Sequence, residues 1–200
     1  MITSADLRHR HAEVWDAAVR HRFVDELWAG TVDDAVMARY LAQDALFLDA
    51  FVALLGAAVS SADEPGARMA VARQLGLVAG DEDDYFTRAL ARLDAAGPVE
   101  PLPPTAGFLT LMESARRSGE YATIMTVLLV AEWLYLDWAD RPDPAPTDWL
   151  HAEWIELHRG PAFAAWVALL RTEVDRVGAD EAVFARAVDL ERAFFDAAYG

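Results

Sequence analysis

The most apolar run of the chain, from Ile124 to Leu136, contains a single acid. Its sequence is IMTVLLVAEWLYL, and the acid is Glu132. If the run is a helix, the residues three and four positions away on either side of Glu132 are all Leu or Tyr and share its face. Burying a carboxylate on such a face costs free energy unless it is paired, and burial raises its pKa. We therefore interpret Glu132 as a candidate general acid or base, with a solvated edge position as the alternative.

Helical periodicity extends over almost the whole chain, and alternating Val, Ile and Thr patterns typical of strands are hard to find. Pro-rich stretches at 97–104 and 141–147 interrupt it and predict connectors. We expect seven to nine helices forming one all-α, bundle-like domain over residues 1–200, with any site between facing helices. The predicted helices run from Ser4 as N-cap to about Trp28, from Asp33 as N-cap to about Ser60, and over 64–78, 82–96, 105–119, 120–139, 148–158, 161–177 and 180–199.

Two further acids lie among apolar and aromatic residues. Asp44, in RYLAQDALFLDAF, has Tyr, Leu and Phe at its helical neighbour positions, and Asp49 faces in a different direction, so one of the two acids is expected to be solvated. Glu191, in AVDLERAFFDAAY, precedes Phe194 and Phe195 by one turn. Each acid has two interpretations, a surface acid of an acidic protein or a member of a buried site.

Composition excludes several classes of function. A net charge of −16 disfavours nucleic acids and anionic membrane surfaces as partners. The chain has no cysteine and no lysine, which excludes disulfides, thiolate chemistry, Schiff bases and Walker-type phosphate binding. The N-terminal segment is polar, and Glu132 and Asp137 interrupt the longest apolar run, so we expect a cytoplasmic protein without a membrane span. We expect no metal site either, since no HExxH spacing exists among His9, His11, His21, His151 and His158.

The segments around these acids resemble the TenA family (thiaminase II, aminopyrimidine aminohydrolase), which has the heme oxygenase-like all-α fold. The resemblance covers nearly the whole chain. It is carried, in this order, by LW before a GT turn (27–31), RYLAQDALFL, LLVAEWLYLDWA, WIELHRGPAF and LERAFFDAAY. It implies hydrolysis of an aminomethyl-pyrimidine to ammonia and hydroxymethylpyrimidine in thiamin salvage, or of formylated or thiamin-derived relatives, without a cofactor.

The resemblance also implies roles for individual residues. One branch of the family carries a catalytic Cys at about the place of Ala131, whereas the cysteine-lacking branch carries a Glu three residues before a Tyr, as Glu132 and Tyr135 stand here. Glu132 and Glu191 would then be an acid/base pair, in which either residue could be the acid and the other the base. Asp44 would bind the ring nitrogen and amino group of the pyrimidine. The other substrate-binding positions would be Phe47, Phe108, Tyr135, His158 and Phe194, with Phe108 and Phe194 on the two faces of the ring.

This chain departs from the family at three positions. Phe47, Phe108 and His158 stand where Tyr is common, so ring stacking is retained while phenolic hydrogen bonds are lost. The resemblance therefore does not fix the identity of the substrate. The first alternative function is a non-catalytic binder or sensor of a heteroaromatic ligand. A heme- or cofactor-handling oxygenase relative, with His9, His11 or His21 as ligand, is the second. The family also suggests a homo-oligomer, a dimer or a tetramer. The small residues of 56–62 could pack between subunits, or equally within one subunit.

Overall fold

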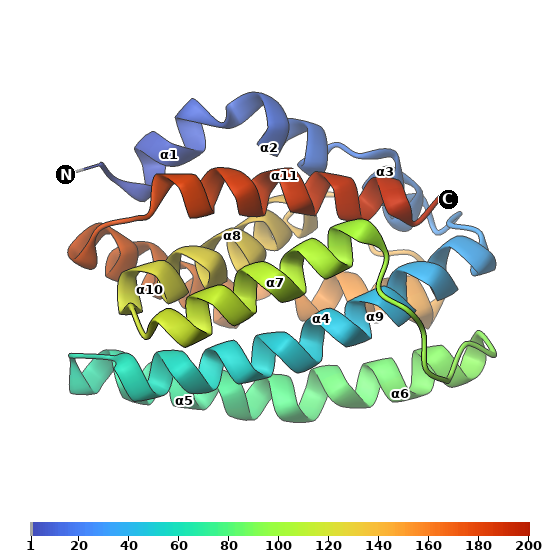
Figure 1. Ribbon diagram of the computed structural model, residues 1–200. Coiled ribbons are helices and arrows are strands. Elements are labelled where there is room, and N and C mark those ends of the chain that lie inside the picture. Colours follow the sequence, from blue (N-terminus) through green and yellow to red (C-terminus); the bar gives the residue numbers. More distant parts are fainter. Residues whose placement is uncertain (1) are drawn as a thin grey trace.

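The computed structural model describes residues 2–200, and within them it contains helices and no strand (Figure 1). The all-α fold class is therefore confirmed. The helices are α1 (Ser4–Arg10), α2 (Ala12–Val19), α3 (Arg22–Ala29), α4 (Asp34–Ser61), α5 (Pro65–Leu77), the π-helical turn η1 (Val78–Glu82), α6 (Asp83–Arg92), α7 (Pro103–Ser118), α8 (Tyr121–Ala139), α9 (Trp149–Leu157), α10 (Gly160–Val177) and α11 (Glu181–Ala197).

Helix α8, which carries the apolar run, lies at the centre of the bundle. It packs against α10, α11, α4 and α7, and nearly every residue from Ile124 to Tyr135 is buried on all faces. A helix that is apolar all round is stable in water only when neighbours cover it completely. The position of Glu132 within this helix therefore places its carboxyl inside the core.

The N-terminal segment forms three short helices instead of the one predicted from Ser4 to about Trp28. Thr3, rather than Ser4, is the N-cap of α1, because its side chain and that of Asp6 form a reciprocal capping box. The chain bends at His11 and again at His21. Helix α2 packs along α11, whereas α3 contacts α9. The breaks at His11 and His21 therefore let the N-terminal segment change direction and pack against two different helices.

Helices α5 and α6, predicted as separate, are joined through η1 and run alongside α4 (Figure 1). The sequence predicted one helix over 64–78 and another over 82–96, but the chain passes through one wider π-helical turn without stopping. Such single turns inserted in α-helices are frequent at functional sites. The turn ends at Glu82, where the chain passes the inner face of α4.

The two Pro-rich connectors are confirmed except at one end. We expected no helix in 97–104, but Pro103 and Pro104 form the first turn of α7. Proline is tolerated there because the first N–H groups of a helix have no intrahelical acceptor. Asp33 is the N-cap of α4 as predicted, since its carboxylate accepts from the N–H of Ala35 at 2.9 Å.

Two helices, α4 and α8, are long and apolar enough to cross a membrane by length and composition alone. In α8, 78% of the apolar window is buried inside the bundle, as in the core helix of a soluble protein. In α4 the share is 28%, and this helix packs against α5, α6, α7 and α8. Both helices carry a buried acid near their middle, Asp44 in α4 and Glu132 in α8.

Candidate active site

A small cavity lies between α4, η1, α8 and α9, and the space of about 380 Å³ around it includes open solvent. The cavity brings together five of the residues singled out from the sequence. Its lining consists of Asp44, Phe47, Leu48, Phe51, Glu82, Ala131, Glu132, Tyr135, Trp154 and His158.

Asp44 is buried in this lining, and its Oδ2 has no hydrogen-bond partner. Burial raises the pKa of Asp44 well above its usual range, and the charge of Glu82 raises it further. Asp49, on the other side of α4, is exposed as expected. An unpaired buried carboxyl oxygen costs free energy unless a ligand or water satisfies it, so Asp44 is suited to hold a polar ligand.

Glu132 is buried with one well-defined partner. The indole Nε1–H of Trp166, on α10, donates to Glu132 Oε1 at 2.8 Å. Burial raises the pKa of Glu132 to about 8, although the bond from Trp166 acts in the opposite direction. Because Trp166 occupies one oxygen, the other oxygen remains for a ligand.

Glu191 is also buried but does not line the cavity. Its Oε1 has no hydrogen-bond partner. Burial raises the pKa of Glu191 well above the usual range, and the nearby charges of Asp44 and Glu132 raise it further. All three acids for which the sequence left a surface or a buried position open are therefore buried; two of them face the cavity and the third does not line it.

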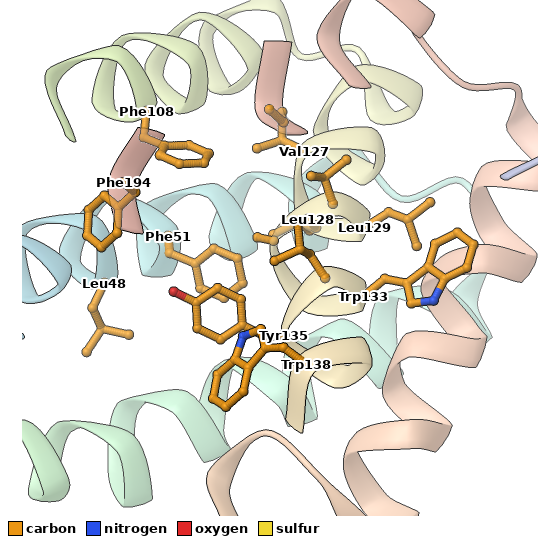
Figure 2. Close-up of a cluster of buried hydrophobic side chains, with 14 of the residues drawn as sticks. Leu48, Phe51, Phe108, Val127, Leu128, Leu129, Trp133, Tyr135, Trp138 and Phe194 are labelled. Atoms are coloured by element: carbon orange, nitrogen blue, oxygen red, sulfur yellow. The ribbon is translucent and has the colours of Figure 1, made fainter. Parts of the chain in front are cut away.

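Tyr135 belongs to the cavity wall, and its hydroxyl and that of Tyr40 are 2.7 Å apart in a buried hydrogen bond. Figure 2 shows the hydroxyl of Tyr135 directed toward the side where Leu48 and Phe194 lie. The pair links α8 to α4 close to Asp44, and it fixes the orientation of the Tyr135 ring. Tyr40 was known from the sequence only as a helical neighbour of Asp44.

Phe108 and Phe194 lie behind the cavity, and their arrangement does not match the predicted ring sandwich. Their ring centroids are 6.5 Å apart and the planes are inclined by 74°, so the two rings meet edge to face (Figure 2). No planar ligand fits between rings in this arrangement. The rings that line the cavity are instead Phe47 and Phe51, stacked at 5.6 Å, with Phe108 against the edge of Phe47 at 5.1 Å.

His158 follows α9 and lines the cavity with an uncharged ring. Its Nδ1 lies 2.8 Å from the carbonyl oxygen of Trp154. Burial lowers the pKa of His158 to about 4, so the ring is neutral at neutral pH. Since a carbonyl only accepts, Nδ1 carries the single proton and Nε2 is an acceptor. A Tyr at this place could donate a hydrogen bond, whereas His158 accepts one.

Glu82 is the residue of this site that the sequence analysis missed. It stands in the acidic run DEDD, which resembles a solvated helix start. In the structure it is partly buried at the end of η1 and lines the cavity. Burial raises its pKa to about 7. No local signal in this run of acids predicts a position at a cavity for Glu82.

The histidines of the N-terminal helices do not line the cavity. His21 caps α3 by accepting from the N–H of Phe23, and its Nε2 lies 3.1 Å from Asp196. Both of its ring nitrogens are therefore occupied. His11 packs against Phe184, away from the cavity. Among the described residues no cluster of three or more His, Asp or Glu side chains could hold a metal ion.

Trp166→Phe tests the partner of Glu132. The substitution keeps an aromatic ring but removes the N–H donor together with the five-membered ring that carries it. Because the donor lowers the pKa of Glu132, we expect this pKa to rise above about 8 in the variant. Carboxyl-carbon NMR of protein labelled on glutamate measures the shift. An unchanged or lowered pKa would show that the indole does not stabilise the ionised form of Glu132.

Comparison with known proteins gives a consistent set of relatives. The model of the TENA/THI-4/PQQC family matches residues 8–200. A protein of Halalkalibacterium halodurans named aminopyrimidine aminohydrolase is 21% identical over 215 residues, covering 100% of this chain and 96% of that protein.

Solved structures have the same fold. A TenA homologue from P. horikoshii OT3 superposes with a TM-score of 0.85 at 21% identity, covering 100% of this chain and 99% of the other. A structure from Silicibacter sp. TM1040, described as a TenA family transcription regulator, gives a TM-score of 0.80 at 21% identity, with 97% and 95% covered.

Proposed function

Because this chain belongs to the TENA/THI-4/PQQC family, we propose that it is a thiaminase II-like C–N hydrolase that acts on an aminomethyl-pyrimidine and uses a pair of Glu side chains in place of a Cys. The observation that carries the proposal is the acid cluster, in which Asp44 and Glu132 face one small cavity and Glu191 lies behind them. The relative from H. halodurans bears the name of this activity.

The cavity suits a single flat heteroaromatic ring. Phe47, Phe51 and Tyr135 supply aromatic surface, and Asp44 supplies a carboxyl whose Oδ2 is unpaired. A protonated Asp44 can donate to a ring nitrogen and accept from the adjacent exocyclic amine at the same time. The raised pKa of Asp44 favours this protonated form. Asp44 would thus orient the ring through two parallel hydrogen bonds.

The reaction replaces nitrogen by oxygen at the exocyclic carbon. The C–N bond of the aminomethyl group breaks with its electron pair going to nitrogen, and a C–O bond forms from water. We assign Glu132 to the amine, because it faces the cavity and its free oxygen can hold and move a proton at the leaving nitrogen. The proton of the attacking water passes to an ionised carboxylate of the acid cluster. The ammonia released takes up one proton and leaves as ammonium.

Electrostatics keep the two Glu side chains in different protonation states. Carboxylates that share an apolar pocket repel each other, so ionising one raises the pKa of the next. Glu132 and Asp44 act on Glu191 in this way, and burial raises all three pKa values. One carboxyl therefore retains a proton at neutral pH for the leaving amine while another can ionise and take the proton of water.

The proposal is tested by ammonia release from 4-amino-5-aminomethyl-2-methylpyrimidine, with thiamin and the N-formyl derivative assayed for their own products. We expect turnover of the aminomethyl compound. Tight binding of hydroxymethylpyrimidine without turnover of any of the three would support the binder or sensor instead. No turnover and no binding would show that this chain has taken another ligand. Full activity in both Glu132→Gln and Glu191→Gln would contradict the Glu-pair mechanism.

We further propose a cytoplasmic homo-oligomer, as the resemblance to the family suggests. At the C-terminal end of α4, Gly56 and Ser60 are exposed small residues at which another helix could approach closely. Light scattering of the purified protein measures its mass in solution. A mass of 22.0 kDa, that of one chain, would contradict the oligomer.

A further inference from the structure

A second, outer cavity borders the cavity described above. The outer one has about 800 Å³, part of it open to solvent, and lies between α5, η1, α9 and the start of α10. Three side chains line both cavities, namely Glu82, Glu132 and His158. These three residues form the boundary between the two cavities, which we call the junction.

All three residues of the junction offer hydrogen-bond acceptors. Glu82 contributes a carboxyl group with no hydrogen-bonded partner among the described residues, and Glu132 contributes the oxygen that Trp166 leaves free. His158 contributes Nε2, because Nδ1 donates to the carbonyl of Trp154. A ligand group that matches three acceptors must carry several N–H donors.

The charged residues that line the two cavities also favour a cationic ligand. No Arg side chain is among the described residues that line the inner cavity, although it holds three acids. Arg159 lines the outer cavity, but its guanidinium is hydrogen-bonded to Glu156. A positive ligand at the junction would therefore favour the ionised forms of these acids, and no Arg side chain in the described part of the inner lining opposes it.

A second feature shows that the cavity is built for a ligand. The Oδ2 atom of Asp44 is buried in the same cavity without a partner, although buried carboxyl oxygens are nearly always hydrogen-bonded. Asp44 is on α4 and Glu82 on η1, so polar groups from two segments converge on one enclosed space.

We propose that Glu82 is a substrate-binding residue which, with His158 and Glu132, forms an ammonium subsite, so that the enzyme takes an aminomethyl heteroaromatic compound with a cationic primary amine. The ring occupies the inner cavity and the –NH3+ group lies at the junction. The substrate ammonium can pass one proton to ionised Glu132, which leaves a neutral amine beside protonated Glu132. The two states differ only in the position of this proton along one hydrogen bond. This inference rests on the proposed function and extends it to the charge of the substrate.

The chemistry at the subsite balances as follows. The substrate R–CH2–NH3+ and one water give R–CH2–OH and NH4+, with one positive charge on each side. The C–N electron pair leaves with nitrogen, and the water proton reaches the released ammonia through a carboxyl group. Because the junction borders the outer cavity, ammonium leaves toward the surface without passing the ring. The neutral alcohol makes no charged contact with Glu82.

The test compares a charged and a neutral ligand on matched variants. Calorimetry measures the Kd of hydroxymethylpyrimidine for the wild type, Glu82→Gln and His158→Phe, and an ammonia assay measures the KM of the aminomethyl-pyrimidine. We expect Glu82→Gln to raise the KM of the amine roughly 10- to 100-fold and to leave the Kd of the alcohol within about threefold. Glu156→Gln is the control, because Glu156 is exposed and lines the outer cavity but not the inner one.

The outcomes separate this inference from the proposed function. Turnover by the wild type tests the hydrolase, whereas the difference between the change in KM of the amine and the change in Kd of the alcohol tests the subsite. An equal rise of both constants in Glu82→Gln would show a merely structural role, and no change in either would show no role. Either result overturns the ammonium subsite while leaving the hydrolase in place. Circular dichroism of each variant verifies folding.

Discussion

Glu132→Gln is expected to lower kcat roughly 10³-fold and, at pH 8, to raise the melting temperature of the protein. The activity is lost because an amide cannot exchange a proton with the leaving amine. The amide still presents an oxygen to Trp166, whose N–H donates to Glu132 in the native protein. The site therefore keeps its geometry, and the gain in stability comes from removing a buried group that ionises.

The sign of the stability effect follows from the pKa of Glu132, which burial raises from its usual 4.5 to about 8. Between these values the unfolded chain loses its proton while the folded protein retains it, so stability falls as pH rises through this window. Glutamine does not ionise, so Glu132→Gln does not lose stability as the pH rises through this window. We expect no gain at pH 4 and a gain of roughly 5–10 °C at pH 8, corresponding to a few kcal/mol.

Glu173→Gln is the matched control for the buried position. Glu173 on α10 is buried, but it accepts from Tyr121 at 3.0 Å and from Arg176 at 2.7 Å, away from the cavity. Losing its charge weakens an ion pair, so we expect a lower melting temperature with unchanged kcat. Scanning calorimetry at several pH values measures both variants. Destabilisation of Glu132→Gln at pH 8 would contradict a carboxyl held protonated by burial.

The buried acids on α4, α8 and α11 could be predicted because the information is local. Asp44, Glu132 and Glu191 each have apolar or aromatic neighbours one turn away, so burying that face buries the acid as well. The helices themselves follow from the same periodicity. Asp33 and Gly119 marked helix ends correctly, since Gly119 ends α7 with a φ of 67°.

The parts that could not be predicted depend on tertiary packing. Glu82 lies in a run of acids typical of a solvated helix start, and only the passage of η1 beside α4 places it at a cavity. Phe108 and Phe194 are in the core as expected, but their mutual inclination of 74° is set by how α7 and α11 cross. The bends at His11 and His21 lack Gly or Pro, so no local signal marked them.

Asp44→Ala is expected to lower the affinity for the pyrimidine roughly 100- to 1,000-fold, whereas Asp44→Asn keeps it within about tenfold. The raised pKa of Asp44 implies a carboxylic acid that donates one hydrogen bond and accepts another. An amide offers the same pair from NH2 and C=O, whereas alanine offers neither.

Calorimetry with hydroxymethylpyrimidine tests the Asp44 variants without the complication of turnover. Asp49→Ala is the control, because Asp49 lies five residues along the same helix and is exposed. The affinity of the Asp49→Ala variant for hydroxymethylpyrimidine should equal that of the wild type. Equal, large losses in Asp44→Asn and Asp44→Ala would show that the pyrimidine needs an ionised acid at this position, and Asp44 would then hold a cationic ring instead of a neutral one.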